Sequence, residues 1–173
     1  MRRLSSSLLF VVSLASCGKG GSAPAAPRGP DLSSPEAVWA QASKALEAGD
    51  LASLAPFLSE AGARQVRGDL EAWRSVLADR DTGPRTFARI PAAKTEGERA
   101  DLERALAGDL ASLLRVYVRA DPHPAPAALA APVPPRAPEA TWAELEYGAH
   151  DGSRRRVVLT REAKEWRIVQ IQL

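Results

Sequence analysis

The spacing of apolar residues changes once along this chain, at a proline-rich stretch between residues 121 and 138. Before it, apolar residues recur every three or four positions, as on one face of a helix; after it, they alternate as in a half-buried strand. This order predicts an α+β fold in which N-terminal helices pack on a C-terminal antiparallel meander sheet. The length of 173 residues and the ordinary content of 45% apolar and 25% charged residues suit one domain with terminal extensions.

The first helix is marked by the segment Ser33-Ser34-Pro35-Glu36. Ser33 with Glu36 fits a capping box, and Ser34 followed by Pro35 fits an N-cap with proline at the first helical position. We expect this helix to end at Gly49 and Asp50 to cap a short second helix that reaches about Leu58.

A third helix is predicted from about Ser59 to Ala78, because apolar residues at Val66, Leu70, Trp73 and Leu77 form one stripe. A short strand is expected near residues 86–90.

The segment 94–120 is harder to assign. Its leucines suit a helix to about Leu114, whereas Val116-Tyr117-Val118 suits either a helix or a strand, and Gly108-Asp109 could interrupt the helix. The proline-rich insert 121–138 is expected to cross the surface as an irregular or polyproline-like segment.

Three strands are predicted at the C-terminal end, over residues 141–149, 154–161 and 165–173. Asp151-Gly152 between the first two is a strong hairpin signal. The run Arg154-Arg155-Arg156 suits a solvated strand that pairs with Glu144 and Glu146. The alternative is a patch that attracts anionic lipid or an acidic partner.

Residues 1–16 have the pattern of a secretory signal. Arg2 and Arg3 provide the positive start, an apolar run is centred on residues 8–12, and the small residues Ala15 and Ser16 follow. The apolar run is too short for a bilayer-spanning helix, which needs about 20 residues.

The single cysteine, Cys17, follows directly. Leu14-Ala15-Ser16-Cys17 resembles the lipobox of bacterial lipoproteins. The resemblance implies lipidation of Cys17 with long acyl chains such as palmitate, cleavage before it, and a cell-envelope location, with Gly18 favouring the outer over the inner membrane. The alternative is an unmodified thiol behind an ordinary signal. A catalytic or metal-binding role is disfavoured because a lone thiol lacks co-ligands.

Residues 17–32 are rich in Gly, Pro, Ala and Ser, and predict a lipidated, disordered tether. Residues 33–173 then form a single α+β domain that contains the insert. Its start, Ser33 to Ser59, and its final strand, Lys164 to Leu173, resemble the NTF2-like domains of bacterial lipoproteins. That resemblance implies a cone-shaped, cystatin-like fold with an apolar pocket. The candidates to line that pocket, or simply to fill the core, are Trp39, Trp73, Trp142 and Trp166.

The charge balance argues against a nucleic-acid partner. Without Arg2 and Arg3, 21 basic residues remain against 21 acidic ones, which leaves no basic footprint. His123 and His150 have no co-ligands at metal-binding spacing, and no catalytic or phosphate-binding motif occurs, so we expect no cofactor, metal or catalytic site.

The leading hypothesis is therefore a non-enzymatic binding or accessory module. It would be held at the membrane by lipid on Cys17, with an envelope protein or a small apolar ligand as its partner. An envelope enzyme with a small pocket is the first alternative, and a structural partner in an envelope complex is the second.

Overall fold

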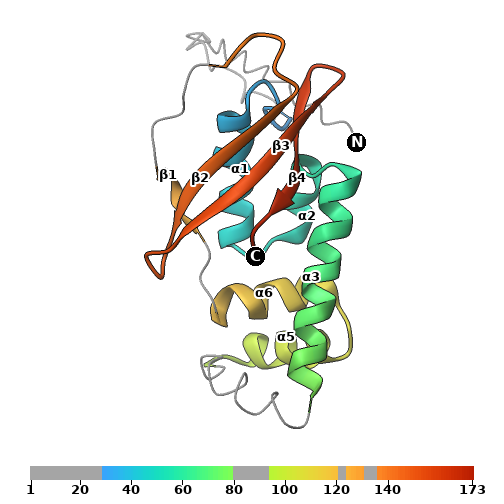
Figure 1. Ribbon diagram of the computed structural model, residues 1–173. Coiled ribbons are helices and arrows are strands. Elements are labelled where there is room, and N and C mark those ends of the chain that lie inside the picture. Colours follow the sequence, from blue (N-terminus) through green and yellow to red (C-terminus); the bar gives the residue numbers. More distant parts are fainter. Residues whose placement is uncertain (1–28, 80–93, 121–123, 131–135) are drawn as a thin grey trace, which may run out of the picture.

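The computed structural model describes residues 29–79, 94–120, 124–130 and 136–173. The sheet lies over α1, the long helix α3 runs beside the sheet and beyond it, and α5 and α6 pack at the far end of α3 (Figure 1). The predicted α+β arrangement is confirmed. Its elements are α1 (Pro35–Glu47), α2 (Leu51–Leu54), the 3₁₀ turn η1 (Ala55–Phe57), α3 (Glu60–Ala78), α5 (Glu96–Leu106), α6 (Leu110–Ala120), β1 (Pro124–Leu129), β2 (Trp142–Ala149), β3 (Arg154–Glu162) and β4 (Glu165–Ile171).

The start of α1 follows the second of the two predicted patterns. The Ser34 hydroxyl oxygen accepts a hydrogen bond from the Ala37 N–H at 3.1 Å, and Pro35 is the first helical residue. The last helical residue is Glu47, and Gly49, whose φ of 65° suits glycine, turns the chain out of the helix two residues later. The Asp50 side chain caps α2 as predicted. A Cβ on Gly49 would lie 2.8 Å from the Arg115 Cα, so this turn also packs closely on α6.

The segment 94–120 forms two helices, and the strand option for its end is wrong. Gly108, with a φ of 101°, interrupts the helical backbone between α5 and α6, and the Asp109 carboxylate caps α6. Helix α6 then continues through Val116 and Val118, both buried against the rest of the fold. Tertiary burial therefore overrides the strand preference of these β-branched residues.

The sheet has the order β1-β2-β3-β4, antiparallel throughout. The three C-terminal strands begin and end within two residues of the predicted limits. The prediction for residues 121–138 is wrong in part, because Pro124–Leu129 forms β1. Prolines cannot donate to a ladder, and an edge strand tolerates them since only one side of it is paired. The strand expected near residues 86–90 lies outside the described residues.

The inner face of the sheet forms one core with the helices. Alternate residues of β2 and β3 point inward and are buried, and α1 and α3 supply the opposing apolar residues. The buried sheet residues are Ala143, Leu145, Tyr147, Ala149, Val157, Leu159, Trp166, Ile168 and Ile171.

The free edge of β4 is covered by three other segments. Leu32 O accepts from the Trp166 N–H at 2.9 Å, and the Ser59 N–H donates to Ile168 O at 2.9 Å. Leu32 also packs against the core, so the fold includes a residue that the sequence analysis placed in the tether.

Gln65 of α3 completes this edge with its side chain. Its amide oxygen accepts from the Ile171 N–H at 3.1 Å and its amide nitrogen donates to Ile171 O at 3.0 Å, as a neighbouring strand residue would. The same amide nitrogen donates to the Asp69 carboxylate, which fixes the orientation of the amide. Pairing the edge in this way removes a template for aggregation.

Candidate functional site

The four tryptophans occupy three different environments. Trp39 and Trp166 are buried in the core, at 1% and 6% exposure. Trp73 is partly buried at the edge of the core, whereas Trp142 is 61% exposed on the outer face of the sheet. The structure therefore does not bring the four together in one pocket, and Trp142 is not a core residue.

Trp39 fills the space between α1 and β2. Its ring lies against that of Tyr147, with centroids 4.4 Å apart and planes tilted by 37°. Burial raises the pKa of the Tyr147 hydroxyl, which donates to Gln172 O at 3.0 Å. Both rings are part of the apolar core, and for Trp39 this is the second of the two roles predicted for the tryptophans.

Trp73 lines an apolar groove between α3, α6 and the C-terminal residue. Its ring meets the edge of Tyr117 at a centroid distance of 5.2 Å and an interplanar angle of 88°. The groove has a volume of about 270 Å³ and is bordered by Asp69, Leu70, Ala72, Trp73, Val76, Tyr117 and Leu173. We call this hollow the α3–α6 groove.

Asp69 has the one acidic side chain among the described residues that border the α3–α6 groove. Burial raises its pKa, and the hydrogen bond from the Gln65 amide opposes this rise. Among the other described residues that border the groove, no side chain is a carboxylate or an imidazole. The other bordering side chains are mostly apolar, so the groove is suited to binding an apolar group.

Two further hollows are each more polar or more open than the α3–α6 groove. One of about 330 Å³ lies between α1 and α2, beside Lys44, Asp50 and Phe57. The other, of about 280 Å³, lies on the outer face of the sheet beside Glu144 and Arg156. Neither hollow is enclosed by the core.

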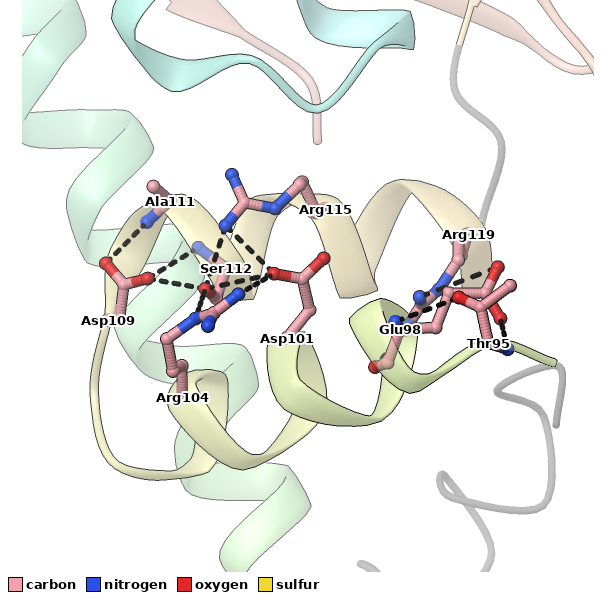
Figure 2. Close-up of polar contacts among 9 residues, drawn as sticks. All are labelled: Thr95, Glu98, Asp101, Arg104, Asp109, Ala111, Ser112, Arg115 and Arg119. Carbon is pink, nitrogen blue, oxygen red and sulfur yellow. Dashed lines mark hydrogen bonds and ion pairs between the residues drawn. The ribbon is translucent and has the colours of Figure 1, made fainter. Parts of the chain in front are cut away.

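A polar cluster joins α5 to α6, and sequence reasoning did not identify it (Figure 2). The Asp101 carboxylate accepts from Arg104 at 2.7 Å and from Arg115 at 3.0 Å. Ser112, which is fully buried, donates its hydroxyl proton to Asp109 and accepts from Arg104 Nε at 3.2 Å and from Arg115 at 2.9 Å. Because both lone pairs of this hydroxyl are occupied, Ser112 is a structural group and not a nucleophile.

The electrostatics of the cluster support the same role. Burial alone would raise the pKa of Asp101, but hydrogen bonds and charge from Arg115 and Arg104 outweigh it and hold the pKa below its usual value. The hydrogen bond from the Ser112 hydroxyl, together with backbone hydrogen bonds at the start of α6, likewise lowers the pKa of Asp109. At the other end of the pair of helices, Arg119 lies 3.9 Å from Glu98, whose carboxylate completes a capping box with Thr95.

Replacing Asp101 with asparagine should therefore loosen the α5–α6 pair. We expect the free energy of unfolding at pH 7 to fall by about 1–3 kcal/mol, because two arginines lose their charged acceptor. The folded-state pKa lies below the unfolded value, so the stabilisation is complete above about pH 4 and is lost as the pH falls through the folded pKa. Urea titrations of both proteins at pH 7 and pH 2.5 test this.

The control is Glu103→Gln, an exposed carboxylate two residues along the same helix, which should leave the free energy of unfolding almost unchanged. An Asp101→Asn deficit that is equally large at pH 2.5 and pH 7 would contradict the ionic account of the cluster.

The arginine run has the predicted strand pairing. Arg156 lies 3.1 Å from Glu144 and Arg154 lies 3.9 Å from Glu146, both across β2 and β3. His150 is exposed in the β2–β3 turn, with its Nε2 atom 3.8 Å from Glu47, and His123 lies outside the described residues. The favoured reading of this charge run as a paired strand is confirmed.

Comparison of the chain with protein-family models, with curated proteins and with solved structures gives no match. Within the part of the chain that the structure describes, no three His, Cys, Asp or Glu residues are grouped so that they could hold a metal ion. Among the helices described, none has the length and apolar character needed to cross a membrane.

Proposed function

We propose that this protein is a bacterial envelope lipoprotein, anchored by lipid on Cys17, whose folded domain is a non-enzymatic binding module. The observation that carries the proposal is the sequence Leu14-Ala15-Ser16-Cys17 behind a positively charged and apolar leader. Each buried methylene contributes about 0.8 kcal/mol, so two or three acyl chains provide a nearly permanent anchor. An outer-membrane location is part of the proposal, since Gly18 follows the cysteine.

Substituting Cys17 with serine tests the anchor. The variant should incorporate no labelled palmitate in cells and should accumulate as a precursor that keeps residues 1–16, because an alcohol cannot replace the acylated thiol. The matched control is Ser16→Ala, which retains a small residue before the cysteine and should be labelled and processed normally. Palmitate incorporation into the serine variant would rule out the lipobox assignment.

An NTF2-like relationship for the domain is also a proposal. It is supported by the turn at Gly49-Asp50 between α1 and α2 and by the antiparallel meander that ends the chain. Fold likeness does not specify activity, so the function has to be argued from the groove.

The α3–α6 groove supports binding of an apolar side chain from an envelope protein. Its volume of about 270 Å³ lies just under the range of about 300–1,000 Å³ typical of small-molecule sites. Its walls are mostly apolar, with the Trp73 and Tyr117 rings set edge to face. Aromatic side chains that bury area at little conformational cost are typical of the anchor points in protein interfaces.

Binding of a small apolar probe tests the groove. Benzyl alcohol, titrated in the millimolar range and followed by NMR, should shift the ring resonances of Trp73 and Tyr117 before those of the buried Trp39. Val76→Arg, at the rim of the groove, should remove these shifts, whereas Glu71→Arg, exposed on the same helix, should preserve them. Shifts of equal size in both variants would exclude the groove as the binding site.

A further inference from the structure

Trp142 is the most exposed large apolar side chain among the described residues. It is 61% exposed, against 44% for Val76 and 43% for Leu106. The alternation along β2 accounts for its direction, because Ala143 and Leu145 point into the core and Trp142 must therefore point outward. The indole is therefore available to a partner outside the domain.

Trp142 lies at the end of the sheet where the N-terminal segment joins the fold. The backbone of Leu32 accepts a hydrogen bond from Trp166 of β4. Trp166 is the register partner of Arg161 in β3. The Arg161 N–H in turn donates to Thr141 O at 2.8 Å. These residues form one row across the sheet, beside Trp142. Three strand spacings separate Leu32 from this position, which is about 15 Å. The start of β2 and the β3–β4 turn lie at the same end of the molecule (Figure 1).

The proposed anchor fixes which end faces the membrane. Residues 17–32 are predicted from their composition to be a flexible tether, and a flexible chain of that length has a root-mean-square extension of about 20 Å. A lipid on Cys17 would thus hold the row through Leu32 close to the bilayer surface, at an effective concentration in the millimolar range. At such a concentration even a weak contact becomes populated.

We propose that the Trp142 end of the sheet rests on the bilayer, with the indole of Trp142 in the boundary between headgroups and acyl chains. Indole rings favour that boundary because they combine an apolar body with one polar N–H. This inference rests on the proposed lipid anchor.

The contact does not depend on anionic lipid. Arg161 donates to Pro138 O at 2.9 Å, Arg167 donates to Pro56 O at 2.9 Å and also pairs with Glu165, and Glu162 is exposed beside them. Arg161 and Arg167 are thus already bonded, and the β3–β4 turn carries one exposed charge of each sign, on Glu162 and Lys164. Vesicles of neutral phosphatidylcholine are therefore sufficient.

Site-directed spin labelling of the lipidated full chain in phosphatidylcholine vesicles tests the proposal. One label replaces Thr160, the register partner of Trp142, and the control label replaces Arg154 on the same face of β3. Six strand residues separate the two sites by about 20 Å. Cys17, once acylated, does not react with the label. We measure the accessibility of each label to a water-soluble nickel chelate.

The expected result is that the label at Thr160→Cys loses most of its accessibility on the vesicles, while the label at Arg154→Cys does not. Adding Trp142→Ala should restore access at position 160. If the protein floats with the vesicles and both labels stay equally accessible, the proposed orientation is wrong and the lipid anchor stands. If the protein does not float and Cys17 itself takes up the label, the anchor and the orientation both fail.

Discussion

Gly62→Ala is expected to destabilise the domain more than any other single-methyl addition in α3. A Cβ at this position would lie 2.1 Å from Ile168 O and 3.1 Å from the Ile168 carbonyl carbon. Both are backbone atoms of β4, and Ile168 O also accepts the Ser59 N–H, so the strand cannot move without losing that bond. We expect the free energy of unfolding to fall by about 3 kcal/mol or more, a large part of a typical total of about 5–15 kcal/mol.

Gly68→Ala is the matched control, six residues along the same helix. A Cβ on Gly68 would meet no atom within 4 Å, and alanine is the better helix former, so this variant should gain about 0.5–1 kcal/mol. Urea denaturation followed by circular dichroism gives both values. A similar gain for Gly62→Ala would show that α3 does not pack on β4 as closely as described.

Trp39→Ala is the second change with a large expected effect. The ring is 1% exposed and lies against Tyr147, so its removal leaves a cavity between α1 and the sheet. Truncating a buried tryptophan to alanine lowers the free energy of unfolding by about 3–5 kcal/mol. The expected result is a folded fraction that is reduced or lost at 37 °C, measured by thermal unfolding.

Trp142→Ala provides the comparison within the same residue type. Because Trp142 is 61% exposed, the unfolding free energy should change by no more than about 0.5 kcal/mol. Equal losses for the two variants would contradict the assignment of Trp39 to the core and Trp142 to the surface. A stable Trp142→Ala protein is also what the vesicle experiment requires.

Local sequence patterns correctly predicted the features that are set by residues close together in the chain, namely helix ends, a hairpin turn and strands with one buried face. Ser34, Gly49 and Asp50 act at helix ends as their side chains and backbone preferences indicate. The Asp151-Gly152 hairpin and the alternation in β2 and β3 placed those strands correctly, since one face of each is buried.

Contacts between distant residues set the features that the sequence did not indicate. The burial of Val116 and Val118 decides that α6 continues as a helix, and pairing with β2 decides that Pro124–Leu129 is a strand. Gln65 and Ile171 are 106 positions apart, and no local sequence pattern indicates that a side chain will complete a strand edge.

The candidate site was predicted only in part, for the same reason. Trp73 was identified as a candidate, but Tyr117, Leu173 and the cluster around Ser112 were not. The helical spacing of Leu110, Leu113 and Tyr117 was a signal that placed Tyr117 on an inward face, yet it did not indicate which helix would face it.

The most direct test of the account is mass spectrometry of the N-terminal peptide of the protein isolated from membranes. We expect Cys17 to be the first residue and its mass to be increased by diacylglycerol, with or without a further acyl chain on its amino group. A mature N-terminus at any other residue, or an unmodified Cys17, would contradict the lipid anchor and the membrane-facing orientation that rests on it.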